Sequence, residues 1–222
     1  FKGKLSGRIK ISIASTAKYV IPYFLSGCMN KNDGVDLVMD VTNKSKVIRN
    51  LEKNEVDLVL ISVLPKKLKV NSVDLMRNQL FLVGGKQLTK EELSRQEQLI
   101  TEVPLIFREE GSATRKAMED FIVKNGFHIR KKIELTSNEA VKQSVIAGLG
   151  VSIMPLIGIK NELAANDLQI IPSSYLPITS MWQITWLKSK KLNPVATAFL
   201  NYLENEKETI VRKDFSWIES YH

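Results

Sequence analysis

The segment FREEGSATRKAM contains residue types that can bind an anion. An apolar run ends at Phe107, a glycine turn follows, and Ser112 opens a helical pattern. Helix N-termini expose unpaired backbone N–H groups and carry partial positive charge, which attracts anions. Arg108 and Arg115 add two cations to this turn. The segment therefore predicts a ligand-binding turn in which Ser112 caps the helix, contacts a ligand, or does both.

The two arginines of this turn each have more than one role open to them. Arg108 can pair with Glu109 or Glu110 at the surface, or it can face a ligand. Arg115 falls in the first helical turn, where a cation opposes the helix dipole. It therefore needs a partner, which is either a bound anion or a neighbouring subunit.

In the first half of the chain, polar residues stand directly after three predicted strands. Such residues can cap the following helix or contact a ligand, and the pattern leaves both roles open. The strands are expected at residues 9–13, 36–41 and 57–61, and the polar residues that follow them are Ser15, Thr16, Thr42, Asn43 and Ser62.

In the second half, Thr136 and Glu139 have the spacing of a capping box and precede a helical run. This spacing predicts a structural role for Thr136. Ser137 and Asn138 are then expected to be free to face a ligand.

The candidate residues of the two halves stand at equivalent positions, because the same order of strands and helices is predicted for both halves. Each half reads strand, helix, strand, helix, strand, which is typical of a mostly parallel sheet covered by helices. Thr42 of the first half matches Thr136 of the second. Ligands of such sheets bind beyond the carboxyl ends of the strands.

Two further strands, near residues 80–86 and 182–188, are expected to cross between the halves. A last helix is predicted to begin at Pro194. We expect the chain to return to the first half and this helix to belong there. The predicted fold is α/β, with two Rossmann-like lobes joined by two crossing strands and a ligand cleft between the lobes. Lobe I is expected to comprise residues 1–84 and 186–222, and lobe II residues 85–185.

The composition is that of a globular protein. The 222 residues are 44% hydrophobic and 25% charged. No run of 18 apolar residues is present, so neither a membrane span nor a membrane partner is expected. The single cysteine, Cys28, excludes an intrachain disulfide and is expected to be a small buried hydrophobe rather than a nucleophile.

The net charge of +8 is carried by lysines and arginines that are spread along the whole chain. Most of these side chains are expected to form solvated faces, and anion attraction or proximity to DNA is the alternative.

Catalysis and metal binding have little support in the sequence. The two histidines are His128, before a strand, and His222, and neither stands near the predicted site. No Cys/His or Ser/His pairing, metal-ligand spacing, RNA-binding aromatic motif or helix-turn-helix is evident. The sequence therefore predicts no enzyme activity, no catalytic residue, no metal and no cofactor.

Three segments resemble the effector-binding domain of LysR-type transcriptional regulators. They are LSGRIKISIAST, REEGSATR and SNEAVKQSVIAGLGVSIMP, and they occur in the family's order over essentially the whole chain. The turn is most similar to the subgroup that regulates carbon-fixation and sulfur-assimilation operons. Many members read Arg-Glu-Pro-Gly-Ser-Gly-Thr-Arg there, whereas this chain has Glu110 for proline and Ala113 for the second glycine.

This resemblance implies a fold like that of type 2 periplasmic binding proteins, in a cytoplasmic protein. It implies a small anionic effector in the cleft, and DNA binding only through an N-terminal winged helix-turn-helix absent from this chain, with Phe1 falling where the family's linker ends. The implied effector-binding residues are Ser15, Thr16, Thr42, Asn43, Ser62, Arg108, Ser112, Ser137 and Asn138.

The resemblance also implies a homodimer or homotetramer. The helices at residues 17–29 and 114–125 are expected to pair antiparallel across a two-fold axis. The implied interface residues are Tyr19, Tyr23, Arg115 and Met118.

Two other functions remain as alternatives. A periplasmic-type solute-binding protein for a small anion has the same fold, but the free Cys28 and the missing export signal argue against it. An enzyme on this scaffold is disfavoured because no acid–base set is evident.

Overall fold

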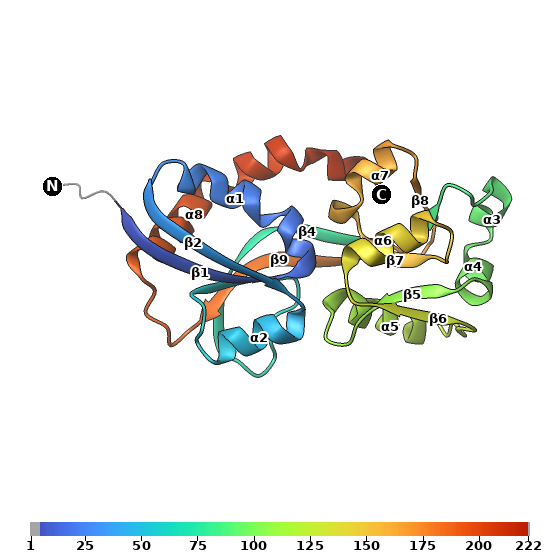
Figure 1. Ribbon diagram of the computed structural model, residues 1–222, viewed down its shortest axis with the longest axis horizontal. Coiled ribbons are helices and arrows are strands. Elements are labelled where there is room, and N and C mark those ends of the chain that lie inside the picture. The colour runs from blue at the N-terminus through green and yellow to red at the C-terminus, as the bar shows by residue number, and fades with distance from the viewer. Residues whose placement is uncertain (1–4, 222) are drawn as a thin grey trace. The chain divides into compact units, whose positions relative to one another are not determined.

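The computed structural model describes residues 5–221, apart from the side chains of residues 96 and 97, and divides into two compact units. Unit 1 extends up to Arg77 and resumes at Met181, and unit 2 is Asn78–Ser180. Strands β4 (Val70–Gly85) and β9 (Ile178–Leu187) each run from one unit into the other (Figure 1). The unit boundaries thus lie at 77/78 and 180/181, and not at the expected 84/85 and 185/186.

The boundaries differ because β4 is longer than its apolar signal. The sequence shows a continuous apolar run at residues 80–83, whereas the strand begins at Val70. Its first half is mostly exposed and carries polar residues such as Asn71 and Asp74. A strand of this kind lacks the continuous apolar run that marks burial on both faces.

Unit 1 is built on a parallel sheet. Its elements before β4 and after β9 are β1 (Ser6–Ala14), η1 (Ser15–Tyr19), α1 (Ile21–Met29), β2 (Gly34–Thr42), α2 (Lys44–Glu52), β3 (Leu58–Ile61), α8 (Pro194–Asp214) and η3 (Ser216–Ser220). β1 lies between β2 and β3 and is parallel to both, and β9 is antiparallel to β3. Figure 1 shows α1 and α8 on one face of this sheet and α2 on the other. β3 is fully buried because both faces are covered.

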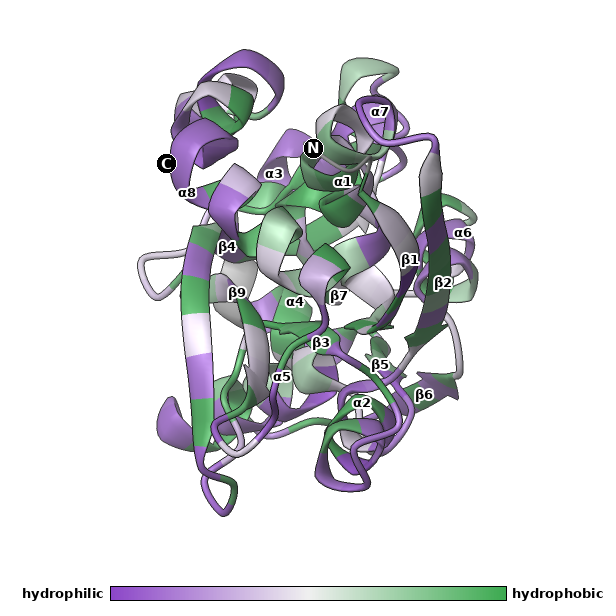
Figure 2. Ribbon diagram, turned by 90° about the vertical axis from the view of Figure 1, so that its left-hand side faces the viewer, coloured by the Kyte–Doolittle hydropathy of each residue, from purple (hydrophilic) through white to green (hydrophobic). Residues whose placement is uncertain are grey.

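The helices of unit 1 each bury one face. In α8, Phe199 and Leu203 are buried while Glu204 and Asn205 are exposed. Figure 2 shows this alternation as hydrophobic and hydrophilic residues along the same helix. The pattern has the 3.6-residue period of an amphipathic helix, as the sequence predicted.

Unit 2 repeats the strand–helix order. Between β4 and β9 its elements are α3 (Lys90–Ser94), α4 (Gln96–Glu102), β5 (Leu105–Arg108), α5 (Ala113–Lys124), β6 (Lys132–Leu135), α6 (Asn138–Ile146), β7 (Ser152–Pro155), η2 (Leu156–Gly158), α7 (Lys160–Ala164) and β8 (Leu168–Ile170). β5 is parallel to β6, and Leu105 bridges to Val151 in the parallel sense. β7 is antiparallel to the second half of β4. Helices α5 and α6 both contact β5.

Several short elements of unit 2 escaped the sequence analysis. The sequence pattern indicated no helix directly after Gly85, but the structure contains α3 and α4 there. α3 begins with a capping box in which Thr89 and Glu92 bond reciprocally. Short polar helices lack an apolar stripe, so hydrophobic periodicity does not mark them. No helix of the described residues is long and apolar enough to cross a membrane.

Candidate functional site

In unit 1, the carboxyl ends of three parallel strands bring the predicted polar residues together. Ala14, the last residue of β1, is paired with Thr42, the last residue of β2. Ile13 is paired with Leu60, so Ser62 also follows β3 at this edge. We call this edge, with Ser15, Thr16, Thr42, Asn43 and Ser62, the site edge of unit 1.

The caps at this edge differ in part from those expected. Asn43 is the N-cap of α2, and its side-chain oxygen accepts from the backbone N–H of Lys46 at 3.1 Å. Ser15 and Thr16 are not caps, because the chain enters a 3-10 helix whose N-cap is Ala14 and makes no side-chain cap bond. Of the two roles left open for Ser15 and Thr16, the structure does not show the capping role, and α1 begins only at Ile21.

A partly buried hydrogen-bond network supports the site edge of unit 1. Ser12, fully buried in β1, donates to Asp40 Oδ2 of β2 at 3.3 Å. Asn50 of α2 donates to the same carboxylate at 3.0 Å and to the Ser12 hydroxyl at 3.1 Å. These bonds link α2 to both strands, two residues before the strands end at Ala14 and Thr42.

In unit 2, Arg108 is the centre of the corresponding edge. It is the last residue of β5 and is paired with Leu135, the last residue of β6. Its Nε and Nη2 atoms donate to the two carboxylate oxygens of Glu109 at 2.8 and 3.0 Å, and its Nη1 donates to Asn138 Oδ1. The predicted pairing with Glu109 is present, but Arg108 is buried rather than at the surface.

The helix caps of unit 2 complete this edge. Ser112 caps α5 by accepting from the N–H of Arg115 at 3.4 Å, as the sequence predicted. α6 is capped by Ser137, which accepts from the N–H of Ala140 at 3.0 Å. We call this edge, with Arg108, Ser112, Ser137 and Asn138, the site edge of unit 2.

The expectation of a cap at Thr136 is wrong, because Ser137 takes that position. Because the helix begins one residue later than expected, Glu139 falls one position too early for a reciprocal bond to the cap. Glu139 instead accepts from Gln143 at 2.9 Å and pairs with Lys142 at 3.0 Å. Asn138 is buried and bonded to Arg108.

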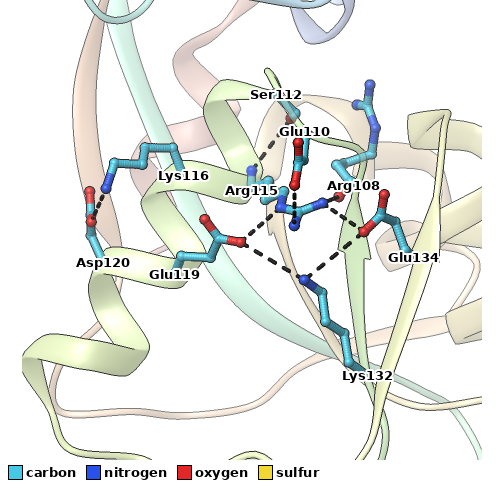
Figure 3. Close-up of polar contacts among 9 residues, drawn as sticks. All are labelled: Arg108, Glu110, Ser112, Arg115, Lys116, Glu119, Asp120, Lys132 and Glu134. Carbon is cyan, nitrogen blue, oxygen red and sulfur yellow. Dashed lines mark hydrogen bonds and ion pairs between the residues drawn. The ribbon is translucent and has the colours of Figure 1, made fainter.

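Arg115 finds the partners that its position requires within its own unit (Figure 3). Its Nε donates to Glu119 at 2.8 Å, and its Nη1 donates to Glu134 of β6 at 2.7 Å and to the carbonyl of Arg108 at 3.2 Å. The hydrogen bonds to Glu119 and Glu134 outweigh partial desolvation and raise the pKa of Arg115. The expectation that its partner is an anion or another subunit is therefore wrong.

The residues expected at a dimer interface, Tyr19, Tyr23 and Met118, differ from one another in how much of each is exposed. Met118 is fully buried in the hydrophobic core of unit 2, because it lies on the same face of α5 as Phe121 and Ile122. Tyr19 is half-buried and Tyr23 is about half exposed. Tyr23 packs edge-on against Phe215 with 5.0 Å between ring centroids, so part of its surface is covered by its own chain.

The sequence of this chain matches a known protein family. Residues 2–208 match the LysR substrate binding domain family. The chain belongs to this family.

Two curated relatives of this LysR domain are transcriptional regulators by name. A RuBisCO operon transcriptional regulator of Allochromatium vinosum is 35% identical over 207 residues, which are 92% of this chain and 68% of the relative. The HTH-type transcriptional activator CmpR of Synechocystis sp. is 32% identical over 211 residues, which are 94% of this chain and 69% of the relative.

Solved regulatory domains share the fold. The CcmR regulatory domain of Synechocystis, solved in complex with 2-PG, has a TM-score of 0.83 at 28% identity and covers 95% of this chain and 99% of its own. The effector binding domain of QuiR has a TM-score of 0.78 at 15% identity and covers 92% of this chain and 99% of its own. The predicted α/β fold of periplasmic-binding-protein type is thus confirmed.

The LysR domain also contains polar partners that sequence reasoning missed. Buried Lys142 of α6 pairs with Glu162 at the start of α7 at 2.6 Å, in addition to Glu139. Ser152 of β7 donates to the carbonyl of Ile106 at 2.6 Å. A serine inside the apolar run GVSIMP was the available signal for Ser152, whereas the Lys142–Glu162 pair joins two helices and has no local signal.

His128 and a cavity of unit 1 lie outside the two site edges. Within the described residues there is no group of three or more potential metal ligands, and His222 lies outside them. His128 is exposed. A cavity of about 730 Å³ in unit 1 is lined by residues 191–194, 197, 198 and 201 at the start of α8.

Proposed function

We propose that this LysR domain binds a small anionic effector and that the polar residues of the two site edges, other than Arg108, are its ligands. The observation that carries the proposal is that, in each unit, parallel strands end at helices whose exposed N–H groups carry partial positive charge. The similarity to the CcmR regulatory domain, solved with 2-PG, supports an anionic effector. The proposed role is binding rather than catalysis.

The three site-edge residues that cap helices, Asn43, Ser112 and Ser137, can still bind a ligand. Ser112 and Ser137 accept a backbone N–H through oxygen, and each hydroxyl proton remains able to donate. Asn43 caps through Oδ1, so its amide NH₂ group can also donate. Hydrogen bonds to a charged group contribute roughly 1.5–3 kcal/mol each, and two or three of them can hold a small anion at micromolar strength.

Arg108 has a different role in this proposal. Its charge is balanced by Glu109 through two hydrogen bonds, and a third bond holds Asn138. An anion that displaced Glu109 would lose the energy of a bidentate pair. Arg108 is therefore proposed to position Asn138 at the start of α6 and to contribute little to binding by direct charge.

The effector is proposed to act on transcription through self-association and through DNA-binding modules outside this chain. The named relatives are transcriptional regulators, and this chain spans about two thirds of their length. A ligand can shift a conformational equilibrium only by its differential affinity for the two states.

We expect the protein to form a dimer through the exposed surface around Tyr19 and Tyr23. Light scattering at high micromolar concentration tests this, and a strictly monomeric particle would contradict it.

The test of the effector proposal is calorimetric titration with 2-PG, after a thermal-shift screen of small anions that includes it. Ser15→Ala combined with Thr16→Val removes two hydroxyls while keeping the buried methyl volume of Thr16. The effector affinity should fall about tenfold or more, which corresponds to the loss of one charge-assisted hydrogen bond. The melting temperature should change little, because neither residue caps a helix.

The matched control is Ser72→Ala with Ser189→Ala, two exposed serines of unit 1 outside the site edge. This control should bind as the wild type does. Unchanged affinity in the folded Ser15/Thr16 variant would place the effector elsewhere, and failure of every anion in the screen to bind would reject the proposal.

A further inference from the structure

The net charge of the protein is confined to unit 1. Residues 78–180 contain equal numbers of basic and acidic residues, so the whole net charge of +8 falls on the rest of the chain. The lysines and arginines themselves are spread along the whole chain, but acidic residues balance them only in unit 2. An excess of one sign destabilises a compact unit through self-repulsion and attracts ions of the opposite sign.

The two units also differ in how their cations are neutralised. In unit 2, the basic residues in ion pairs are Lys86, Arg95, Arg108, Arg115, Lys116, Lys132 and Lys142. Ion pairs of unit 1 join Arg8 to Asp36 and Lys190 to Asp57. Among residues 5–77 and 181–221, more basic side chains are exposed than take part in these two pairs.

Five exposed lysines of unit 1 come from two loops that lie together. Lys66, Lys67 and Lys69 follow β3, and Lys188 and Lys191 follow β9. The backbone N–H of Lys188 donates to the carbonyl of Lys69 at 3.0 Å, which joins the loops directly. None of the five forms an ion pair with another of the residues 5–221 whose side chains are described. We call them the loop lysines.

A small apolar core fixes both loops against α2. Val47 and Leu51 of α2 are buried in this core, and Leu68, Val70 and Leu187 of the two loop regions pack against it. Lys190 reinforces the arrangement, since its ammonium donates to Asn54 Oδ1 at 2.8 Å and to the carbonyl of Val56 at 2.9 Å. The loop lysines are therefore anchored beside one helix rather than on independent, unattached loops.

The exposed side of α2 extends this positive region. Lys46, Arg49 and Lys53 recur at spacings of three and four residues, so they share one side of the helix, away from Val47 and Leu51. Two exposed carboxylates, Glu52 and Glu55, lie at the end of the helix and offset part of this charge. The loop lysines together with Lys46, Arg49 and Lys53 form what we call the basic surface.

We propose that the basic surface contacts the phosphate backbone of duplex DNA. The cations are exposed and distributed over three segments, which suits an extended polyanion. Lysine contacts to phosphates are independent of sequence and provide affinity that falls steeply with salt. This inference rests on the proposed function, in which the domain belongs to a DNA-binding regulator that holds it near DNA at high effective concentration.

The experiment uses the 222-residue chain and a short duplex of arbitrary sequence, followed by fluorescence anisotropy from about 50 to 200 mM salt, a range over which phosphate contacts weaken strongly. The variant is Lys66→Gln, Lys67→Gln, Lys69→Gln and Lys188→Gln. The matched control is Lys90→Gln, Lys124→Gln, Arg130→Gln and Lys131→Gln, four exposed cations of unit 2. Both variants lower the net charge by the same amount.

We expect the loop variant to bind DNA at least tenfold more weakly at low salt, and its slope of log affinity against log salt to fall by roughly 2–4, because each lost phosphate contact removes about 0.9. The control variant should stay within about twofold of the wild type. Equal losses in both variants would show that only net charge matters and would overturn the proposal, as would absence of binding by the wild type. Tighter binding to single-stranded RNA or to anionic lipid vesicles would also overturn it.

The same variants separate this proposal from the effector proposal. The loop lysines lie outside both site edges, so 2-PG titration should give the same affinity for the loop variant and the wild type. DNA binding that depends on the loop lysines would support the basic surface even if no small anion bound. Effector binding without DNA binding would reject the basic surface alone.

Discussion

At the scale of single residues, Arg115 connects several elements of unit 2. It joins α5 to β6 through Glu134 and to the end of β5 through the carbonyl of Arg108 (Figure 3). The guanidinium fork makes these bonds in fixed directions, which a lysine ammonium cannot reproduce. Arg115 therefore fixes the turn that carries Ser112 and supports the site edge of unit 2 indirectly.

We predict that Arg115→Met destabilises the protein by about 1–2 kcal/mol in urea unfolding, because its polar partners lose their donor. The loss stays below the 3–5 kcal/mol typical of a broken buried pair, since the side chains of Glu119 and Glu134 are 40% and 47% exposed and become hydrated. Lys116→Met, which breaks an exposed pair with Asp120, is the control and should have little effect. A loss no larger than the control's would show that the network is dispensable.

Cys28 is the second residue whose environment makes a definite prediction. It is buried in α1, and burial raises the pKa of its thiol although Lys31 partly offsets the shift. Because the thiolate is the reactive form, the native protein should react with an aromatic disulfide reagent far more slowly than the urea-unfolded protein, by about a hundredfold or more. Equal rates in the two states would show that Cys28 is accessible in the native protein.

At the scale of elements, capping determines where several helices begin. Asn43, Ser112, Ser137 and Asn193 each accept a backbone N–H three residues later, at the starts of α2, α5, α6 and α8. Such caps contribute about 1 kcal/mol each and fix the direction of the first helical turn. In three of these helices the cap also stands at a site edge, so local helix formation places the candidate ligand groups.

The capping box of α3 should make that helix sensitive to acid. Hydrogen bonds from the Thr89 backbone and hydroxyl lower the pKa of Glu92 below its usual value of 4.5. The folded helix thus favours the carboxylate, so its contribution is present above pH 4.5 and is lost as the pH falls through the lower pKa of the folded state. The protection of the α3 amides against exchange, measured relative to the intrinsic rate at each pH, should fall on acidification in this range.

Glu92→Gln should abolish this pH dependence, because glutamine does not titrate. Glu91→Gln is the matched control, since Glu91 lies in the same turn but pairs with Arg95 at 2.5 Å. The control should keep the pH dependence at the Thr89 amide. A variant Glu92→Gln with wild-type pH dependence would assign the effect to another group.

At the scale of the whole molecule, the two units differ in charge while sharing an architecture. Unit 2 is neutral and pairs many of its charges internally, whereas unit 1 carries the net charge of +8. Self-repulsion within unit 1 is screened by salt, because the Debye length falls from about 10 Å at 0.1 M to about 3 Å at 1 M. The stability of the two units should therefore respond differently to ionic strength.

We predict that sodium chloride stabilises unit 1 more than unit 2. All three tryptophans, Trp182, Trp186 and Trp217, belong to unit 1, so their fluorescence reports its unfolding. Its melting temperature should rise by a few degrees on going to high salt, which corresponds to about 1 kcal/mol. Amide protection of β1 and β3 should increase more than that of β5 and β7. An equal response in both units would show that the charge of unit 1 is already compensated.

The sequence by itself determined the order of the main strands and helices, the cap at Ser112, and the family resemblance. These depend on patterns of a few consecutive residues, in which side-chain period and cap position are set locally. The short polar helices α3 and α4 lack an apolar stripe, and the one-residue shift from Thr136 to Ser137 is too small for spacing alone to resolve.

The tertiary structure decided which partners the polar residues take. Arg108 meets Asn138, 30 residues further along the chain, and Arg115 meets Glu134, 19 residues further along, because β5 and β6 pair in parallel register. The loop lysines gather because Leu68 and Leu187 pack on the same small core. Contacts of this kind depend on strand pairing and packing between distant segments, which the spacing of residues along a sequence does not specify.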